Sequence, residues 1–210
     1  MFINESEANP QRERSITFEP SDFEGVVPYN DDPMVVTLQI FNWDVKRVLI
    51  DPRSSTDILY YDAFEKIGLD PEQLHPFKGT LAGFTGEQVH VCGHITLKII
   101  FGTGENAKTI RVKYLVVSAP NCYNIIIGQP SFNLLGAFLS TRFLVMKYPM
   151  EKGKVGTLRG DQKTTRECYH NSLKLRKGKK KVRAKEKPLS VNMIDPREEH
   201  QQGTSNPPKS

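Results

Sequence analysis

The feature that most constrains this chain is an apolar run, Val48 to Ile50, that ends on the acidic residue Asp51. An earlier run from Met34 to Ile40 is rich in β-branched residues, and a turn-like Asn42-Trp43-Asp44 separates the two runs. Two such runs joined by a short polar turn are typical of a β-hairpin. The sequence therefore predicts a hairpin whose buried second strand delivers a carboxylate to the loop that follows it, Pro52, Arg53, Ser54 and Ser55.

A short helix is predicted directly after this loop. Ser55 or Thr56 could cap it, apolar residues between Ile58 and Ile67 fall near helical spacing, and Gly68 would end it. Asp57 would then lie at the start of the helix. The later part of the chain contains a single further helical turn, predicted over 131–135, and many short apolar runs between glycine-containing turns, over 79–84, 88–91, 94–101, 111–118, 123–127 and 137–148. Short strands at regular spacing with one or two helices predict a mostly-β barrel or sandwich.

Charge divides the chain into unequal parts. Residues 151–210 contain 16 Lys and Arg against 7 Asp and Glu, a net charge of +9, whereas the whole chain carries only +5. Residues 1–30 are polar and interrupted by prolines, without a periodic pattern. We therefore expect a polar arm or linker over 1–30, one folded domain over 31–150, and a basic tail or linker over 151–210 that has too few apolar residues to bury a core.

The expected location is intracellular, either cytoplasmic or nuclear. The three cysteines, Cys92, Cys122 and Cys168, are odd in number and lack zinc-type spacing, which argues against a disulfide framework. No apolar run approaches the ~20 residues that span a bilayer, and the N-terminus lacks a signal peptide's basic start and apolar core. The opening Met1-Phe2-Ile3 is unlike the start of a domain, which indicates a fragment of a longer reading frame.

Three motifs in order carry a family resemblance. They are Ile50-Asp51-x-x-Ser54-Ser55-x-Asp57-Ile58-Leu59, the glycine-bearing Gly83-Phe84-Thr85-Gly86, and Tyr123-Asn124-Ile125-Ile126-Ile127-Gly128-Gln129-Pro130. Together they resemble the retropepsin-like aspartic protease domain of plant gypsy-type LTR retrotransposon polyproteins. The resemblance runs from about Ile16 to Tyr148, and Asp195-Pro196-Arg197-Glu198 is similar to the linker that precedes reverse transcriptase in those polyproteins.

The resemblance implies a small closed β-barrel with one or two short helices, which works as a homodimer on extended peptides without a cofactor or metal. Asp51 of each chain would share one proton with its partner and activate water. Gly83, Phe84, Thr85 and Gly86 would form a flap over the peptide, which binds as an added strand. Ile126, Ile127 and Gly128 would pack behind the catalytic loop.

The active-site loop departs from the family pattern, which has Asp-Thr-Gly or Asp-Ser-Gly. Pro52 has neither a hydroxyl nor a backbone N–H, so it cannot make the hydrogen bonds between subunits that Thr or Ser would make. Arg53 adds bulk and a positive charge close to Asp51, which would favour two ionised carboxylates over a shared proton. The alternative interpretation is therefore a catalytically inactive domain that holds peptides or dimerises, or a decayed retroelement fragment.

Simpler interpretations stand beside these functional ones. Taken alone, Asp51 is a turn or cap residue, and Gly83 to Gly86 an ordinary hairpin turn. The pairs Cys92-His94 and Cys168-His170 lack the spacing of a tetrahedral zinc site. The basic run from Lys174 to Arg183 could bind phosphate backbones weakly and without sequence preference, serve as a nuclear localisation patch, or be a solvated linker. No membrane partner is expected.

Overall fold

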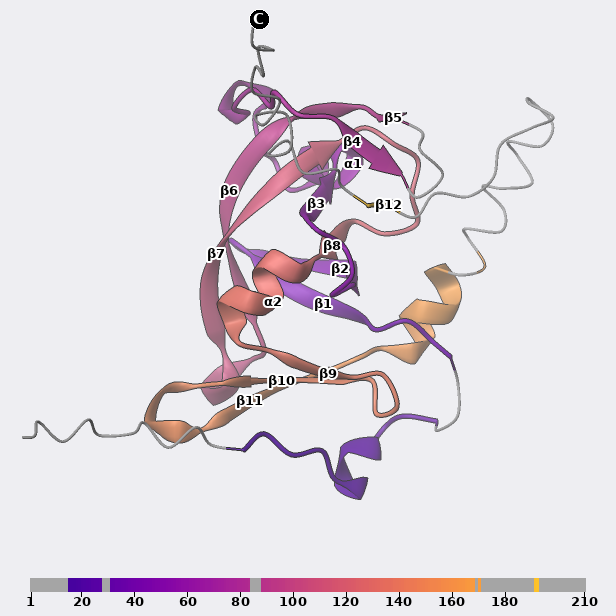
Figure 1. The fold of residues 1–210 in the computed structure, drawn as a ribbon, viewed down its shortest axis with the longest axis vertical. Coiled ribbons are helices and arrows are strands. Elements are labelled where there is room, and N and C mark those ends of the chain that lie inside the picture. Colours follow the sequence, from indigo (N-terminus) through magenta and orange to yellow (C-terminus); the bar gives the residue numbers. More distant parts are fainter. Residues whose placement is uncertain (1–14, 28–30, 84–87, 169, 171–190, 193–210) are drawn as a thin grey trace, which may run out of the picture.

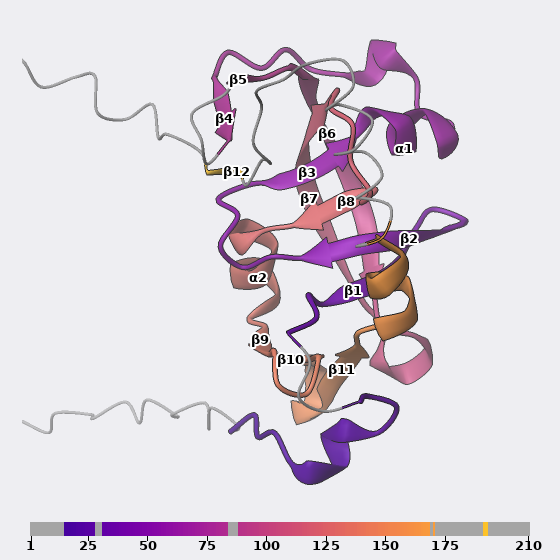
Figure 2. The same ribbon diagram turned by 90° about the vertical axis from the view of Figure 1, so that its right-hand side faces the viewer.

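The computed structural model describes residues 15–27, 31–83, 88–168, 170 and 191–192. Six strands close into a barrel in the order β1-β2-β8-β3-β7-β6, which confirms the expected mostly-β closed barrel (Figures 1 and 2). The barrel strands are β1 (Val35–Ile40), β2 (Trp43–Ile50), β3 (Asp57–Tyr60), β6 (Val91–Phe101), β7 (Lys108–Val117) and β8 (Ile125–Ile127).

Two parallel pairings organise the barrel around the end of β2. Strand β2 runs parallel to β8, with Ile50 opposite Ile127, and β3 runs parallel to β7. The other neighbours pair antiparallel, including the predicted β1–β2 hairpin and the β3–β8 pair. Because β8 lies between β2 and β3, the loop that joins β2 to β3 must cross the end of β8. This crossing brings residues that are distant in sequence to the Asp51 loop.

Two smaller sheets and short helices complete the fold. One sheet has the order β11-β10-β9 and the other the order β12-β4-β5. Their strands are β4 (Leu81–Gly83), β5 (Gln88–Val89), β9 (Phe138–Ser140), β10 (Val145–Pro149), β11 (Val155–Arg159) and β12 (Val191–Asn192). The helices are α1 (Tyr61–Lys66), α2 (Gln129–Leu135), the short 3₁₀ turns η1 (Pro20–Phe23), η2 (Pro71–Gln73), η3 (Gly104–Asn106) and η4 (Glu151–Gly153), and a helical segment over 162–168.

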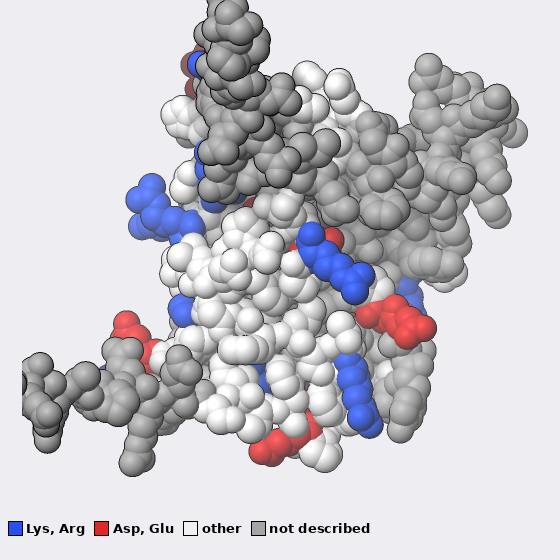
Figure 3. Space-filling view, in the orientation of Figure 1, with Lys and Arg blue, Asp and Glu red and all other residues white. Residues whose placement is uncertain are grey.

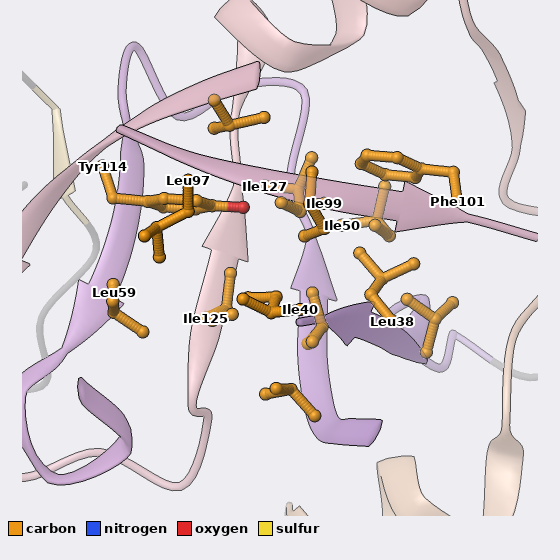
Figure 4. Close-up of a cluster of buried hydrophobic side chains, with 14 of the residues drawn as sticks. Leu38, Ile40, Ile50, Leu59, Leu97, Ile99, Phe101, Tyr114, Ile125 and Ile127 are labelled. Atoms are coloured by element: carbon orange, nitrogen blue, oxygen red, sulfur yellow. The ribbon is translucent and has the colours of Figure 1, made fainter. Parts of the chain in front are cut away.

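Apolar side chains that alternate along the strands fill the barrel. In β1 and β6 the inward residues are buried while most of their neighbours are exposed or partly exposed, as expected for strands with one face on the core. Figure 4 shows this core, which includes Leu38, Ile40, Ile50, Leu59, Leu97, Ile99, Phe101, Tyr114, Ile125 and Ile127. Each fully buried aliphatic side chain contributes roughly 1.5–3 kcal/mol, so the core fixes the strand ends that carry the site.

Two predictions from the sequence were wrong in detail. Asp57 to Tyr60 form strand β3, not the first turn of a helix, because their backbone pairs with β7 on one side and β8 on the other. The helix α1 begins only at Tyr61. The glycine-containing turn predicted between the runs 88–91 and 94–101, at Cys92-Gly93, is a bulge inside the long strand β6, where the register with β7 shifts between Val91 and Gly93. A φ of 155° at Gly93 accommodates the bulge.

Ordered structure extends on both sides of the barrel. Strand β11 pairs with β10 although it lies beyond residue 150. At the other end, the segment around η1 is held to β10 by an ion pair of 2.8 Å between Asp22 and Lys147, both largely buried. Among the described residues, no helix has the length and apolar character needed to span a membrane.

Candidate active-site loop after strand β2

Asp51 is held at the end of β2 by backbone hydrogen bonds. Its N–H donates to the carbonyl oxygen of Ile127 at 2.9 Å, which extends the parallel β2–β8 pairing by one step. Its own carbonyl accepts from the N–H of Ser54 at 3.0 Å, and its Oδ1 accepts from the N–H of Arg53 at 3.1 Å. The side chain is half-buried. The loop thus presents a carboxylate that is fixed in position but still reached by solvent.

The segment Gly128-Gln129 packs behind this loop and is hydrogen-bonded to it. The N–H of Gln129 donates to the carbonyl of Ser54 at 2.8 Å, and the buried Ser54 hydroxyl donates to the carbonyl of Thr56 at 2.9 Å. A Cβ on Gly128 would collide with the carbonyl oxygen of Thr56 and would lie 2.7 Å from that of Ser54. Only glycine therefore fits where the two segments cross. The structure places Ile126, Ile127 and Gly128 behind the Asp51 loop.

Asp57 is a site residue whose role the sequence analysis missed. Its side chain is buried, at 2% exposure, and Oδ1 accepts from the N–H of Gly128 at 2.7 Å. Burial raises the pKa of Asp57 to about 6, although the hydrogen bond from Gly128 lowers it in part. The available signal was an acid placed directly before the apolar run Ile58 to Tyr60. Asp57 therefore ties the loop to the start of α2, while the side chain of Asp51 is only half-buried.

The two unusual loop residues differ in their surroundings. Arg53 is exposed, and among the described residues its guanidinium forms no ion pair with Asp51. Its backbone also lies outside the positive-φ region that would demand glycine. Pro52 is half-buried in the turn. Within one chain, Arg53 contributes its backbone N–H, and not its charged group, to the Asp51 carboxylate.

The predicted flap is described only at its base. Gly83 ends β4, and β4 pairs with β5 through Leu81 opposite Val89 and Ala82 opposite Gln88. Phe84, Thr85 and Gly86 lie outside the described residues. The other edge of β4 pairs with β12, in which Val191 lies opposite Gly83 and Asn192 opposite Ala82. In both ribbon views β12 lies between β4 and the loop that contains Asp51 (Figures 1 and 2).

The described surface shows neither a metal cluster nor a concentrated basic patch on the face in view. Within the described ranges, no group of three or more His, Cys, Asp and Glu side chains could hold a metal ion. Cys168 lies in the protein interior, where its thiol donates to the carbonyl of Cys122 at 3.8 Å. Figure 3 shows lysine and arginine side chains scattered singly on this face, with acidic side chains between them. The basic run from Lys174 to Arg183 lies outside the described residues.

Comparisons with known proteins give a likeness at the level of solved structures. No protein-family model matches the sequence, and no curated protein matches it. The retroviral protease-like domain of Ddi1 from Leishmania major matches with 15% identity and a TM-score of 0.44, over 60% of this chain and 93% of that domain. A retropepsin-like aspartic protease from Rickettsia conorii matches with 17% identity and a TM-score of 0.40, over 54% of this chain and 82% of the other. EIAV protease complexed with the inhibitor HBY-793 matches with 21% identity and a TM-score of 0.39, over 54% of this chain and 99% of the protease. These three solved structures, to which the chain is similar at low identity, are all retroviral or retropepsin-like proteases.

Proposed function

We propose that this chain contains an aspartic-type endopeptidase domain that processes the polyprotein of a plant gypsy-type LTR retrotransposon as a homodimer. The observation that carries the proposal is the difference in burial between Asp51, at the end of β2, and Asp57, the first residue of β3. Asp51 is half-buried and accessible, whereas the Asp57 carboxylate is buried and accepts the Gly128 N–H. One accessible carboxylate cannot supply both an acid and a base, so the chemistry requires Asp51 from a second copy.

The mechanism assigns complementary roles to the two Asp51 side chains. Two carboxylates held close together cannot both ionise cheaply, so one remains protonated while the other is charged. The charged Asp51 accepts a proton from the attacking water, and the protonated one donates to the scissile carbonyl oxygen. The pair titrates as a unit, with apparent pKa values that belong to both residues together. Hydrogen bonds from Arg53 and to Ile127 keep each Asp51 in register.

The substrate in this proposal is an extended peptide bound as an added strand. The hairpin β4–β5 supplies a sheet edge above the loop, and main-chain hydrogen bonds along such an edge give affinity without strong sequence preference. The tail would add weak, salt-sensitive binding to nucleic acid through its lysines and arginines. An intracellular location, cytoplasmic or nuclear, accompanies this proposal.

A second candidate function is a peptide-holding or dimerising domain without catalysis, which could also be the state of a decayed retroelement copy. Pro52 favours it, because proline offers no hydroxyl or N–H to a second subunit. At the position directly after Asp51, proline replaces the threonine or serine that would connect the two copies next to the catalytic pair. Weaker coupling between subunits would leave the two Asp51 carboxylates farther apart. Arg53 adds less weight, because its guanidinium forms no ion pair with Asp51 among the described residues.

A peptide-cleavage assay at about pH 4 to 6 separates the two functions, since a shared-proton pair works in mildly acidic solution. We expect cleavage by the full chain, and a loss of at least about 10²-fold in the Asp51→Asn variant, because general acid–base catalysis contributes about 10²–10⁴. The matched control is Asp62→Asn, an exposed acid in the first turn of α1. Cleavage that appears only after the double change Pro52→Thr/Arg53→Gly would instead establish the non-catalytic function for the natural chain.

Dimerisation is tested separately by sedimentation. We expect a concentration-dependent shift from monomer to dimer, and a tighter dimer in the Pro52→Thr/Arg53→Gly variant, where the hydrogen-bonding hydroxyl is restored. A chain that remains monomeric at tens of micromolar cannot assemble the shared site at that concentration. Activity in such a strictly monomeric sample would contradict the proposed mechanism.

A further inference from the structure

The edge of β4 that does not pair with β5 is occupied by a distant part of the same chain. Strand β4 is the middle strand of a three-stranded sheet, with β5 on one side and β12 on the other. Strand β12 consists of Val191 and Asn192, which pair antiparallel with Gly83 and Ala82. Without β12, this edge of β4 would present unpaired N–H and C=O groups, which readily accept another extended segment.

The position of β12 matters because of what lies beneath it. Both ribbon views place β12 between β4 and the loop that carries Asp51 (Figures 1 and 2). A peptide that adds a strand to β4 on this side would occupy the same edge and make the same kind of main-chain hydrogen bonds. Two segments cannot pair with one strand edge at once. Binding of β12 and binding of such a peptide are therefore mutually exclusive.

We propose that the segment around Val191–Asn192 is an intramolecular competitor that binds the β4 edge in place of an extended peptide. This inference rests on the proposed function only in taking that edge as the peptide site; the pairing itself is independent of catalysis. A segment tethered to its own binding site competes at an effective concentration set by the tether, not by the protein concentration. Dilution of the protein should therefore leave the edge occupied.

Proline substitutions in the full chain test the pairing directly. In an antiparallel pair, alternate residues direct their N–H and C=O groups toward the partner strand. One of the variants Val191→Pro and Asn192→Pro therefore removes a bonded N–H, and the other removes an N–H that points away. Thr204→Pro, farther along the tail, is the matched control for a new proline outside the paired segment.

Hydrogen exchange read by mass spectrometry gives the first result. We expect the peptide that contains Leu81 to Gly83 to exchange about tenfold faster in at least one of the two proline variants, a factor that corresponds to about 1.4 kcal/mol. The Thr204→Pro control should match the natural chain, and exchange should not depend on protein concentration. Unchanged exchange in both variants would overturn the proposal, and protection that appears only at high concentration would assign the edge to a second copy's tail.

Peptide binding gives the second result. A fluorescein-labelled synthetic peptide with the sequence from Lys187 to Arg197 should bind the exchange-sensitive proline variant about tenfold more tightly than the natural chain, because its competitor has been removed. Equal affinity for both proteins would contradict competition. Failure of the peptide to bind any variant would count against the β4 edge as a peptide site and so against the proposed function, while the exchange result still decides whether β12 pairs with β4.

Discussion

Replacing Asp57 with asparagine should remove a large part of the pH dependence of stability between pH 4 and 7. Burial raises the pKa of the Asp57 carboxyl from 3.8 to about 6 in the folded protein. Between these two values the folded state binds more protons than the unfolded state, so the free energy of unfolding falls as pH rises. The full pKa shift changes the free energy of unfolding by about 3 kcal/mol, since each pKa unit corresponds to about 1.36 kcal/mol. About 2 kcal/mol of this change occurs between pH 4 and 7.

The asparagine variant keeps the structural contact and removes the titration. Its side-chain oxygen can still accept the Gly128 N–H, which Asp57 accepts at 2.7 Å, and it carries no buried charge at any pH. The variant should therefore be at least as stable as the natural chain at pH 7. At pH 4, where Asp57 is protonated and neutral, the two proteins should differ least.

Urea unfolding of both proteins at a series of pH values measures this difference. Subtracting one curve of unfolding free energy against pH from the other removes the contributions that both proteins share. These include the stability lost in acid when Asp22 and Asp161, whose pKa values are lowered, become protonated. Asp62→Asn, an exposed acid in α1, is the control and should leave the curve unchanged. A difference between the natural chain and Asp57→Asn that stays constant within about 0.5 kcal/mol across the range would refute the reasoning from linkage.

The remaining predictions concern the loop crossing and the N-terminal segment. Gly128→Ala should cost about 3 kcal/mol or more of stability, because the new Cβ would meet backbone carbonyl oxygens that cannot move away. The control is Gly68→Ala, whose Cβ would meet no atom within 4 Å; because Gly68 has a positive φ, this change should cost about 1 kcal/mol. Both are measured by urea unfolding, and equal losses would contradict the steric argument. Lys147→Met should destabilise the contact of η1 with β10 by about 1.5–3 kcal/mol, because Asp22 loses the charged hydrogen bond from Lys147 and keeps the nearby charge of Arg159. Hydrogen exchange of residues 17–24 measures this change. The control is Lys154→Met, which removes an exposed ion pair with Glu105 and should cost at most about 1 kcal/mol.

The parts of the fold predicted from sequence are those in which local pattern and tertiary pairing agree. The hairpin β1–β2 was predictable because its β-branched runs alternate and a short turn joins them. The stretch from Asp57 to Tyr60 was not, because four consecutive buried residues have no period that separates a strand from a helix. Its state is decided by pairing with β7 and β8, which lie far along the chain. Strand β12, only two residues long, carries no signal of its own.

In the candidate site, too, the features that depend on local sequence were predictable, and those that depend on distant contacts were not. Asp51 could be proposed because a strand-ending acid is a local feature of the sequence. Asp57 could not be assigned its role, since its hydrogen-bond partner Gly128 is 71 residues away and the glycine's need for space appears only where the segments cross. The exposure of Arg53, which decides whether its charge neutralises Asp51, depends on a side-chain direction that spacing does not encode.

The arrangement of Asp51 and Asp57 separates the groups that support the loop from the carboxylate that the proposed mechanism uses. Asp57 is buried, and its carboxylate joins the loop to Gly128, while the Ser54 carbonyl accepts from Gln129. These bonds hold the loop without using the Asp51 carboxylate. One of its oxygens accepts the Arg53 N–H, and the other would meet the reactant in the proposed mechanism. The loop is thus supported within one chain, whereas the carboxylate pair of the proposed mechanism needs a second copy. Replacing Pro52 with threonine, which supplies the hydroxyl that proline lacks, should therefore strengthen assembly and activity between two copies and leave the stability of each barrel nearly unchanged.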